Sequence, residues 1–166
     1  MAEQTMPAIT MRPAIATDHE NLRVALVALQ EYERLLHDTR LPAETFVDRY
    51  LRWMLQQVSE QNGLCLIAEA DNAFAGFVAG WIERMEWMVE TADSTVYGYI
   101  SDIFVLPDWR GQRVATRLLD AAAAHMRDRG MARLRIGLLS NNVAAIAAYR
   151  YAGFQPYEMT MEKALR

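Results

Sequence analysis

The sequence has one cysteine, Cys65, so no disulfide can form within the chain and nothing in it requires an oxidising compartment. Cys65 stands in the apolar run 64–67, which favours a buried strand residue over a nucleophile. The longest apolar run, residues 73–82, is too short to cross a bilayer. The N-terminus has neither the basic start nor the long apolar stretch of a signal peptide. These absences predict a cytoplasmic protein that does not enter a membrane.

An excess of basic residues is also missing, since 17 Lys and Arg face 21 Asp and Glu for a net charge of −4. Binding to nucleic acid needs a basic face, so no nucleic-acid partner is expected, whereas cationic substrates suit an acidic surface. Neither GxxxxGK followed by Ser or Thr nor GxGxxG occurs, which excludes two common nucleotide-binding loops. No His, Cys and Asp residues have the spacing of metal ligands, so no metal is predicted.

A chain of 166 residues with 52% hydrophobic residues is the size of one domain. We therefore expect a single domain over residues 1–166, with residues 1–8 flexible. Apolar periodicity predicts a strand at 9–12, a helix that begins at Thr17 or Asp18, and a second helix from about residue 43 to Asn62-Gly63.

The second half of the chain begins with two strands, 64–70 and 74–84, joined by a short polar turn. A longer connection precedes the strand 96–105, which is followed by a helix that ends near Gly130. A strand at 133–139 then completes a strand-helix-strand unit, so these two strands should be parallel. After another helix, residues 154–163 are predicted to form terminal strands or a hairpin. The predicted order is β-α-α-β-β-β-α-β-α-β.

The chain is organised around residues 101–116, SDIFVLPDWRGQRVAT, which read as a strand that enters a helix through a short loop. The first backbone N–H groups of a helix have no partner inside it, and the helix dipole adds partial positive charge there. Such a site can hold a phosphate, and Arg110 and Arg113 add charge to it.

Two motifs carry a resemblance to a known family. Val105-x-Pro107-x-x-Arg110-Gly111-x-x-x-Ala115 resembles the acetyl-CoA loop of the GNAT superfamily of N-acetyltransferases. Downstream, Asn142-x-x-Ala145-Ile146-x-x-Tyr149-x-x-x-Gly153-Phe154 resembles the helix and turn that close the same cofactor site, with Asn142 as helix N-cap and Gly153 as the C-terminal stop.

The resemblance implies an α/β (α+β) fold, in which a mixed, mostly antiparallel central sheet has a splayed parallel strand pair and helices on both faces. It implies acetyl-CoA as co-substrate, with the pantetheine arm in the gap between the two parallel strands. The residues that it assigns to cofactor binding are Ile103, Phe104, Val105, Arg110, Gly111, Gln112, Arg113, Val114, Ala115, Thr116, Asn142 and Tyr149.

Arg113 stands where the family usually has glycine. A right-handed helical conformation, with the side chain turned outward, is the expectation here because left-handed backbone is costly for a residue with a Cβ atom.

For catalysis, the resemblance implies that Tyr149 gives a proton to the departing thiolate; the alternative is a core aromatic on an amphipathic helix. Asp102 is the second candidate, as a base acting through a water, as an anchor for a cationic acceptor, or as a structural residue of the strand. Strand alternation sends the side chains of Ser101 and Asp102 to opposite faces unless a bulge intervenes.

The acceptor candidates are Glu31, Trp81 and Glu83, because an aromatic ring beside a carboxylate suits an ammonium group. A core position for Trp81 and a solvated helix end for Glu31 are the structural alternatives. The predicted activity is direct acetyl transfer to a small-molecule amine in a ternary complex. Acetylation of a protein lysine or N-terminus and catalytically silent acyl-CoA binding stay open, and a homodimer is one allowed oligomeric state.

Overall fold

The computed structural model describes residues 8–165, and its centre is an open sheet with the strand order β1-β2-β3-β4-β5. The expected flexibility concerned residues 1–8, of which residues 1–7 lie outside the described residues. The strands are β1 (Ile9–Pro13), β2 (Leu64–Ala70), β3 (Ala73–Arg84), β4 (Val96–Val105) and β5 (Leu134–Ile136).

The first four strands are antiparallel, and β4 and β5 are parallel, as the strand-helix-strand pattern predicted. Asp71 and Asn72 join β2 to β3 with φ angles of 50° and 63°. Tight hairpins need two such left-handed residues, and Asp and Asn tolerate them better than most side chains do. The turn at residues 71–72 therefore sets the register of the central hairpin.

Five α-helices lie among the described residues: α1 (His19–Leu36), α2 (Val47–Glu60), the single turn α3 (Ala92–Thr95), α4 (Val114–Asp128) and α5 (Val143–Tyr151). Short 3₁₀ turns at Ala16–Asp18 and Ala43–Thr45 precede α1 and α2. Asp18 is the N-cap residue of α1, at a position that the sequence predicted, but its side chain makes no hydrogen bond to the first turn of α1. Its carboxylate instead accepts from the N–H of Ile15 at 2.8 Å and binds the Arg12 guanidinium, which holds the 3₁₀ turn that precedes the helix.

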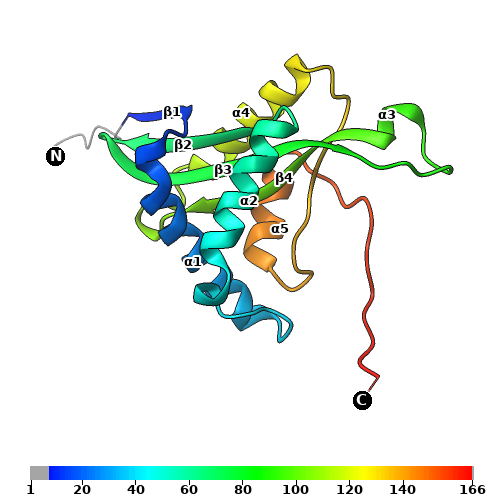
Figure 1. Ribbon diagram of the computed structural model, residues 1–166, viewed down its shortest axis with the longest axis horizontal. Helices are drawn as coiled ribbons and strands as arrows, with labels where there is room; N and C mark the ends of the chain where they lie inside the picture. The colour runs from blue at the N-terminus through cyan, green and yellow to red at the C-terminus, as the bar shows by residue number, and fades with distance from the viewer. Residues whose placement is uncertain (1–7, 166) are drawn as a thin grey trace.

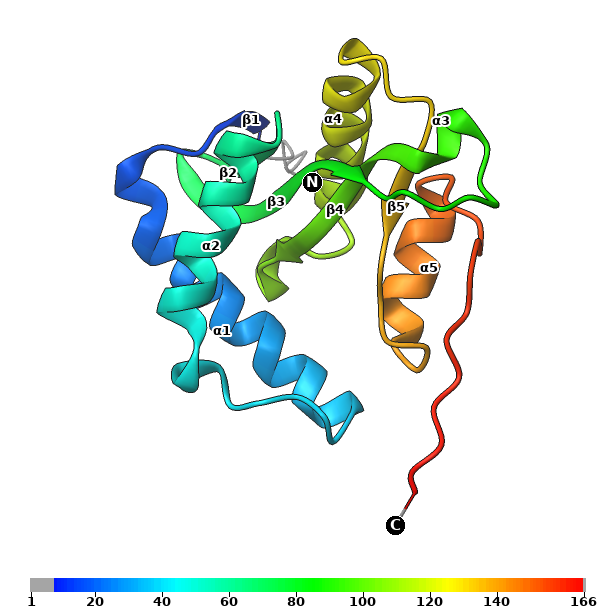
Figure 2. The same ribbon diagram turned by 45° about the vertical axis from the view of Figure 1, so that its right-hand side comes forward.

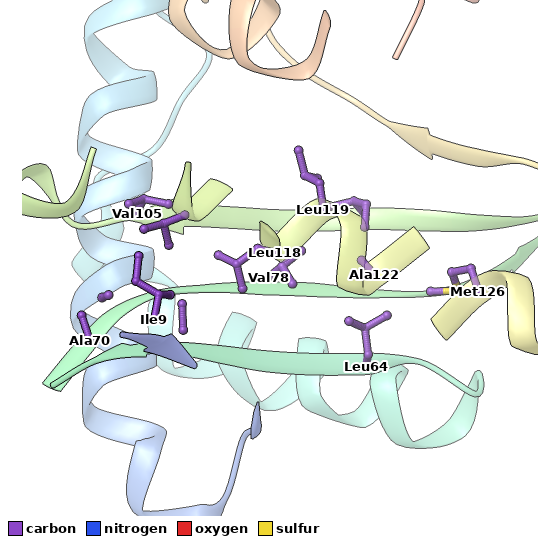
Figure 3. Close-up of a cluster of buried hydrophobic side chains, with 13 residues drawn as sticks. Ile9, Leu64, Ala70, Val78, Val105, Leu118, Leu119, Ala122 and Met126 are labelled. Atoms are coloured by element: carbon purple, nitrogen blue, oxygen red, sulfur yellow. The ribbon is translucent and has the colours of Figure 1, made fainter. Parts of the chain in front are cut away.

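Helices cover both faces of the sheet, with α1 and α2 on one side and α4 on the other (Figure 1). Figure 3 shows the core under α4, where Leu118, Ala122 and Met126 meet Val78 of β3 and Leu64 of β2. The second core contains Leu22 of α1, Met54 of α2 and Phe77 of β3. Two apolar layers hold β4 between them, so the strand that carries Asp102 is fixed from both sides.

The pairing of β4 with β5 is short, running only from Gly98↔Leu134 to Ile100↔Ile136. β5 is shorter than the predicted 133–139, because the chain leaves the sheet after Ile136 while β4 continues to Val105. Among the described residues, the edge of β4 that faces β5 thus has no strand partner beyond Ile100. In Figure 2, α1 and α5 lie on either side of this end of β4.

The prediction of terminal strands at 154–163 is wrong. The segment after α5 has no strand pairing, and it extends away from the sheet in both views (Figures 1 and 2). Tyr157, Met159 and Met161 are 58%, 74% and 83% exposed. The alternating sequence is suited to a strand, but a strand forms only where a neighbouring backbone supplies hydrogen bonds. In the described chain, residues 155–163 make no backbone hydrogen bond to another segment.

Candidate active site

A bulge in β4 shapes the centre of the site. Ala79 pairs with Asp102 and Gly80 pairs with Ile100, so Ser101 is the extra residue on β4. Gly80 is needed opposite the bulge because a Cβ atom there would lie 2.3 Å from the carbonyl oxygen of Tyr99. In a regular strand the side chains of Ser101 and Asp102 would point to opposite faces of the sheet, whereas a bulge changes the direction of one of them. Both residues accordingly line the same two cavities.

Asp102 is a carboxylic acid inside the protein, only 7% exposed. Tyr50 of α2 donates a hydrogen bond from its hydroxyl to Asp102 Oδ2 at 2.9 Å. Burial raises the pKa of Asp102 to about 6, since a charged carboxylate is poorly solvated there, and the hydrogen bond from Tyr50 opposes this rise. A carboxylate with this pKa is ionised at neutral pH and accepts a proton more readily than an exposed one.

Two adjoining cavities meet at this carboxylate. The larger, of about 600 Å³, opens between α1, α2 and β4, and the smaller, of about 60 Å³, lies where β4 and β5 diverge. The side chains that line both cavities include Glu33, Ser101 and Asp102. Tyr149 and Asn142 of the α5 segment line only the smaller cavity. Reactants held in the two cavities would therefore come together beside Asp102.

Tyr149 is half-buried on α5. Burial, with smaller contributions from the negative charges of Glu33 and Asp102, raises the pKa of Tyr149 to about 12. The phenol therefore keeps its proton at neutral pH and can donate it. The Asn142 side chain caps α5 by accepting from the N–H of Ala145 at 3.1 Å, as predicted, and this cap holds the start of the helix at the cavity.

The loop between β4 and α4 presents a row of free backbone donors. Among residues 8–165, no hydrogen bond is donated by the backbone N–H groups of Gly111 to Thr116, and the first paired N–H is that of Arg117, which bonds Arg113 O at 3.0 Å. Gly111 has a φ of 75°, so a side chain at this position would be strained. Such a row of N–H groups at a helix start is suited to an anion.

Arg113 does not have the right-handed helical conformation that we expected. Its φ of 60° and ψ of 17° are left-handed, and its guanidinium lies 5.8 Å from the ring centre of Tyr151. The loop turns sharply into α4, and this turn needs left-handed backbone at both Gly111 and Arg113. Because Arg113 has a Cβ atom, we infer local strain of about 1–2 kcal/mol.

The remaining loop residues are placed as follows. Arg110 donates from Nε to the carbonyl oxygen of Val105 at 3.1 Å, and its guanidinium lies 5.7 Å from the Phe104 ring centre. Of the three strand residues predicted to bind the cofactor, Ile103 lines the smaller cavity, whereas Phe104 and Val105 do not. Gln112 donates to the carbonyl oxygen of Asp108, and this bond closes the loop before α4.

The three predicted acceptor residues are not brought to either cavity. Glu31 accepts from the N–H of Ala43 and from Arg34, so it anchors the connection between α1 and α2. Trp81 is 2% exposed, and its indole N–H donates to Glu83 at 2.6 Å. An acceptor role for Glu31, Trp81 and Glu83 stays a prediction.

Sequence reasoning missed most side chains of the larger cavity, and those with polar groups include Glu33, Arg49, Tyr50 and Tyr99. Tyr50 fell on the apolar face of its helix, and no local signal marked its hydroxyl as the partner of Asp102, which lies 52 residues away. Glu33 lies only two positions after the predicted Glu31. The helical period could have distinguished Glu33 from Glu31, because residues two positions apart on a helix point in different directions.

Cys65 is buried in β2, as predicted, and burial raises the pKa of its thiol to about 12. Within residues 8–165, no group of three His, Cys, Asp or Glu side chains could hold a metal ion. No helix in this part of the chain is long and apolar enough to span a membrane.

Comparison with known proteins identifies the family. The model of the acetyltransferase (GNAT) family matches residues 26–154, which is most of the chain. The chain belongs to the GNAT acetyltransferase family. The predicted family and enzyme class are thus confirmed, and the mixed sheet with helices on both faces is the predicted fold.

Relatives of this acetyltransferase have several names. An uncharacterized N-acetyltransferase of Methanocaldococcus jannaschii is 29% identical over 113 residues, which are 66% of this chain but 46% of the relative. The aminoglycoside N(6')-acetyltransferase type 1 of Stenotrophomonas maltophilia is 30% identical, covering 67% of this chain and 72% of its own length. Thialysine N-epsilon-acetyltransferase of Bos taurus is 23% identical, covering 90% and 86%.

Solved structures show the same fold. Aminoglycoside N-acetyltransferase AAC(6')-Iy in complex with CoA has a TM-score of 0.72 at 21% identity and covers 99% of both chains. A GCN5-related N-acetyltransferase from Ralstonia eutropha has a TM-score of 0.76 at 17% identity and covers 95% of this chain and 99% of its own.

Proposed function

We propose that this acetyltransferase moves an acetyl group from acetyl-CoA to a primary amine of a small molecule by direct attack in a ternary complex. The observation that carries the proposal is the meeting of two cavities at the buried carboxylate of Asp102. Relatives named for thialysine and for aminoglycosides support a small amine as acceptor.

Acetyl-CoA supplies the activated thioester when it is bound, and the chain has groups that fit it. The N–H groups of Gly111 to Thr116 suit its phosphates, and the edge of β4 beyond Ile100 has backbone groups free for its amide-containing arm. Solved relatives bound to CoA support this assignment. In this proposal Asn142 and Tyr149 lie beside the reacting end, because both line the smaller cavity.

In the proposed step, a C–N bond forms to the acetyl carbon and the C–S bond breaks. A primary ammonium loses two protons on becoming an amide. One proton leaves through Asp102 to solvent, and the other reaches the departing sulfur, with the Tyr149 hydroxyl as the donor that faces it. Because the amine attacks the thioester directly, no residue of the chain is acetylated on the way.

The test is a steady-state measurement of thiol release with acetyl-CoA and a panel of primary amines. We expect intersecting lines when both substrates are varied, because both must be bound before transfer. Parallel lines together with an acetylated enzyme would overturn direct transfer. Failure to acetylate any small amine, in a chain that still binds CoA, would overturn the proposed function.

A homodimer is supported by two features that complement each other. Within residues 8–165, one edge of β5 is unpaired, and residues 157–162 form an exposed arm in which Tyr157, Met159 and Met161 alternate with polar residues. If the arm of one copy paired with β5 of a second copy, it would supply the missing strand partner of β5 and cover the exposed apolar side chains of the arm. Sedimentation should show a dimer for the wild type and a monomer when Met159 and Met161 are both replaced by Glu. A wild-type monomer at all concentrations would contradict this.

A reducing compartment such as the cytoplasm suits the chain, since its single thiol, Cys65, is buried in a strand. Fractionation of the native cells, with detection of the chain in each fraction, tests this location. Recovery mainly outside the cytoplasmic fraction would contradict it.

A further inference from the structure

The charges that line the larger cavity do not cancel evenly. Four charged side chains line it: Glu33 and Arg40 from the α1 region, Arg49 from α2, and Asp102 from β4. Arg40 donates from Nε to Glu33 Oε2 at 2.8 Å, so these two groups neutralise each other. One buried carboxylate, Asp102, and one guanidinium, Arg49, are left to meet whatever the cavity holds.

Arg49 lies on the face of α2 that borders the cavity. Phe46, Arg49 and Tyr50, at helical spacings of three and four residues, all line it, and Tyr50 is the residue whose hydroxyl reaches Asp102. Arg49 is therefore adjacent in sequence to Tyr50, the residue that hydrogen-bonds Asp102.

No carboxylate compensates Arg49 within residues 8–165. The two acids nearest to it in sequence, Asp48 and Glu44, both bind Arg23 of α1 instead, at 2.9 Å for Asp48. Arg49 is exposed, which leaves its five N–H donors open to solvent or to a ligand. A planar guanidinium with free donors is suited to a carboxylate or a phosphate.

We propose that the acceptor is an amine that also carries an anionic group, with Arg49 as the specificity-determining residue that binds the anion while the amine lies at Asp102. This rests on the proposed function, and it narrows the acceptor class. A dication would need a second free carboxylate in the cavity, and Glu33 is bound to Arg40. The arrangement therefore favours an amino acid or an amino phosphate over a diamine.

The experiment uses three acceptors with the same six-carbon chain and the same reacting amine, namely 6-aminohexanoate, hexylamine and 1,6-diaminohexane. They place a negative, a neutral and a positive group at the far end. For the wild type we expect kcat/KM to fall in that order, by about tenfold from 6-aminohexanoate to 1,6-diaminohexane. A charge-assisted hydrogen bond at an exposed site changes binding by about tenfold. The ratio should shrink as salt is added.

Variants at Arg49 make the assignment specific. Arg49→Gln should remove the preference for 6-aminohexanoate, Arg49→Lys should restore part of it, and Arg49→Glu should reverse the order in favour of 1,6-diaminohexane. Arg52→Gln is the matched control, because Arg52 is an exposed guanidinium on the same helix that does not line the cavity. It should keep the wild-type order.

The outcomes separate the two proposals. If all three amines are acetylated but the order does not follow charge, or does not respond to Arg49→Glu, the inference about Arg49 is wrong and the acetyltransferase function stands. If 1,6-diaminohexane is the best substrate of the wild type, the charge assignment is reversed and the inference is also wrong. If none of these amines and no other amine of the panel is acetylated, both proposals fall together.

Discussion

The proposed cofactor side and the proposed acceptor side of the site are built differently. On the cofactor side, the groups proposed to bind come from two continuous segments, 103–116 and 142–149, and many of them are backbone N–H groups. On the acceptor side, side chains from α1, α2, β4 and the segment after β5 meet around one cavity. Backbone donors depend little on residue identity, whereas a side-chain cavity depends on it strongly. The first side is thus suited to a constant ligand and the second to a variable one.

The largest expected effect lies where the two sides meet. Tyr149→Phe removes only the phenolic hydroxyl, so CoA affinity should stay close to that of the wild type while kcat falls by about 10²–10⁴, as for loss of a general acid. Calorimetry with CoA and turnover with any accepted amine measure the two quantities. Tyr32→Phe, on the exposed side of α1, is the control. An unchanged kcat would show that Tyr149 is only a packing residue.

Asp102 gives the next largest effect, through pH. Because its pKa of about 6 exceeds the ordinary 3.8, the folded state favours the protonated carboxyl. This contribution to stability is present below about pH 4 and is lost as pH rises through 6. As the pH rises from 4 to 7, the free energy of unfolding of the wild type should therefore fall relative to that of Asp102→Asn by about 2 kcal/mol.

The same variant should also lack the rise of kcat/KM through pH 6 that a general base produces in the wild type. Urea unfolding and rate profiles at several pH values measure the two effects. A stability difference that does not vary with pH would contradict the raised pKa of Asp102. A rate profile that keeps its rise in the variant would contradict its role as base.

Gly111→Glu tests the cofactor side alone. A side chain at a φ of 75° is strained, and a carboxylate there would repel a phosphate at the start of α4. We expect CoA to bind at least about tenfold more weakly, which corresponds to about 1.4 kcal/mol. Gly130→Glu, also at positive φ but at the far end of α4, controls for backbone strain. Equal losses of affinity in both variants would refute the loop assignment.

The smallest effect is expected from Arg113→Gly. Glycine releases about 1–2 kcal/mol of left-handed strain but adds about 0.5–1 kcal/mol of unfolded-state freedom, so the free energy of unfolding should rise by at most about 1.5 kcal/mol. CoA affinity should fall modestly and less so at high salt, if the guanidinium binds a phosphate. Tighter binding at every salt concentration would instead show that Arg113 obstructs the loop.

The sequence predicted what depends on local spacing. The turn at 71–72, the cap at Asn142, the parallel strands on either side of α4 and the buried thiol of Cys65 all follow from short-range patterns, and the structure contains each of them. The loop from Gly111 to Thr116 was also found in this way, because a helix start after a strand leaves N–H groups free whatever the side chains are.

Local patterns also misled in two places. Arg113 was expected in a right-handed conformation, but the direction in which α4 must leave β4 imposed a left-handed one. The alternating residues 154–163 suggested strands, yet alternation describes which side of a strand is apolar and supplies no partner for it.

Tertiary structure alone decided the larger cavity, which is the proposed acceptor site. Tyr50 bonds Asp102 across 52 residues, Arg40 neutralises Glu33, and Arg23 takes the carboxylates that could have paired with Arg49. Each pairing depends on which helices pack over β4 and in what rotation, and the helical period of α1 and α2 does not contain that information. The sequence by itself thus determined the family, most of the fold and the loop of unpaired N–H groups before α4 that we propose binds phosphate. The protonation of Asp102 and the charge left open at Arg49 were set by packing, because burial and long-range pairing govern both.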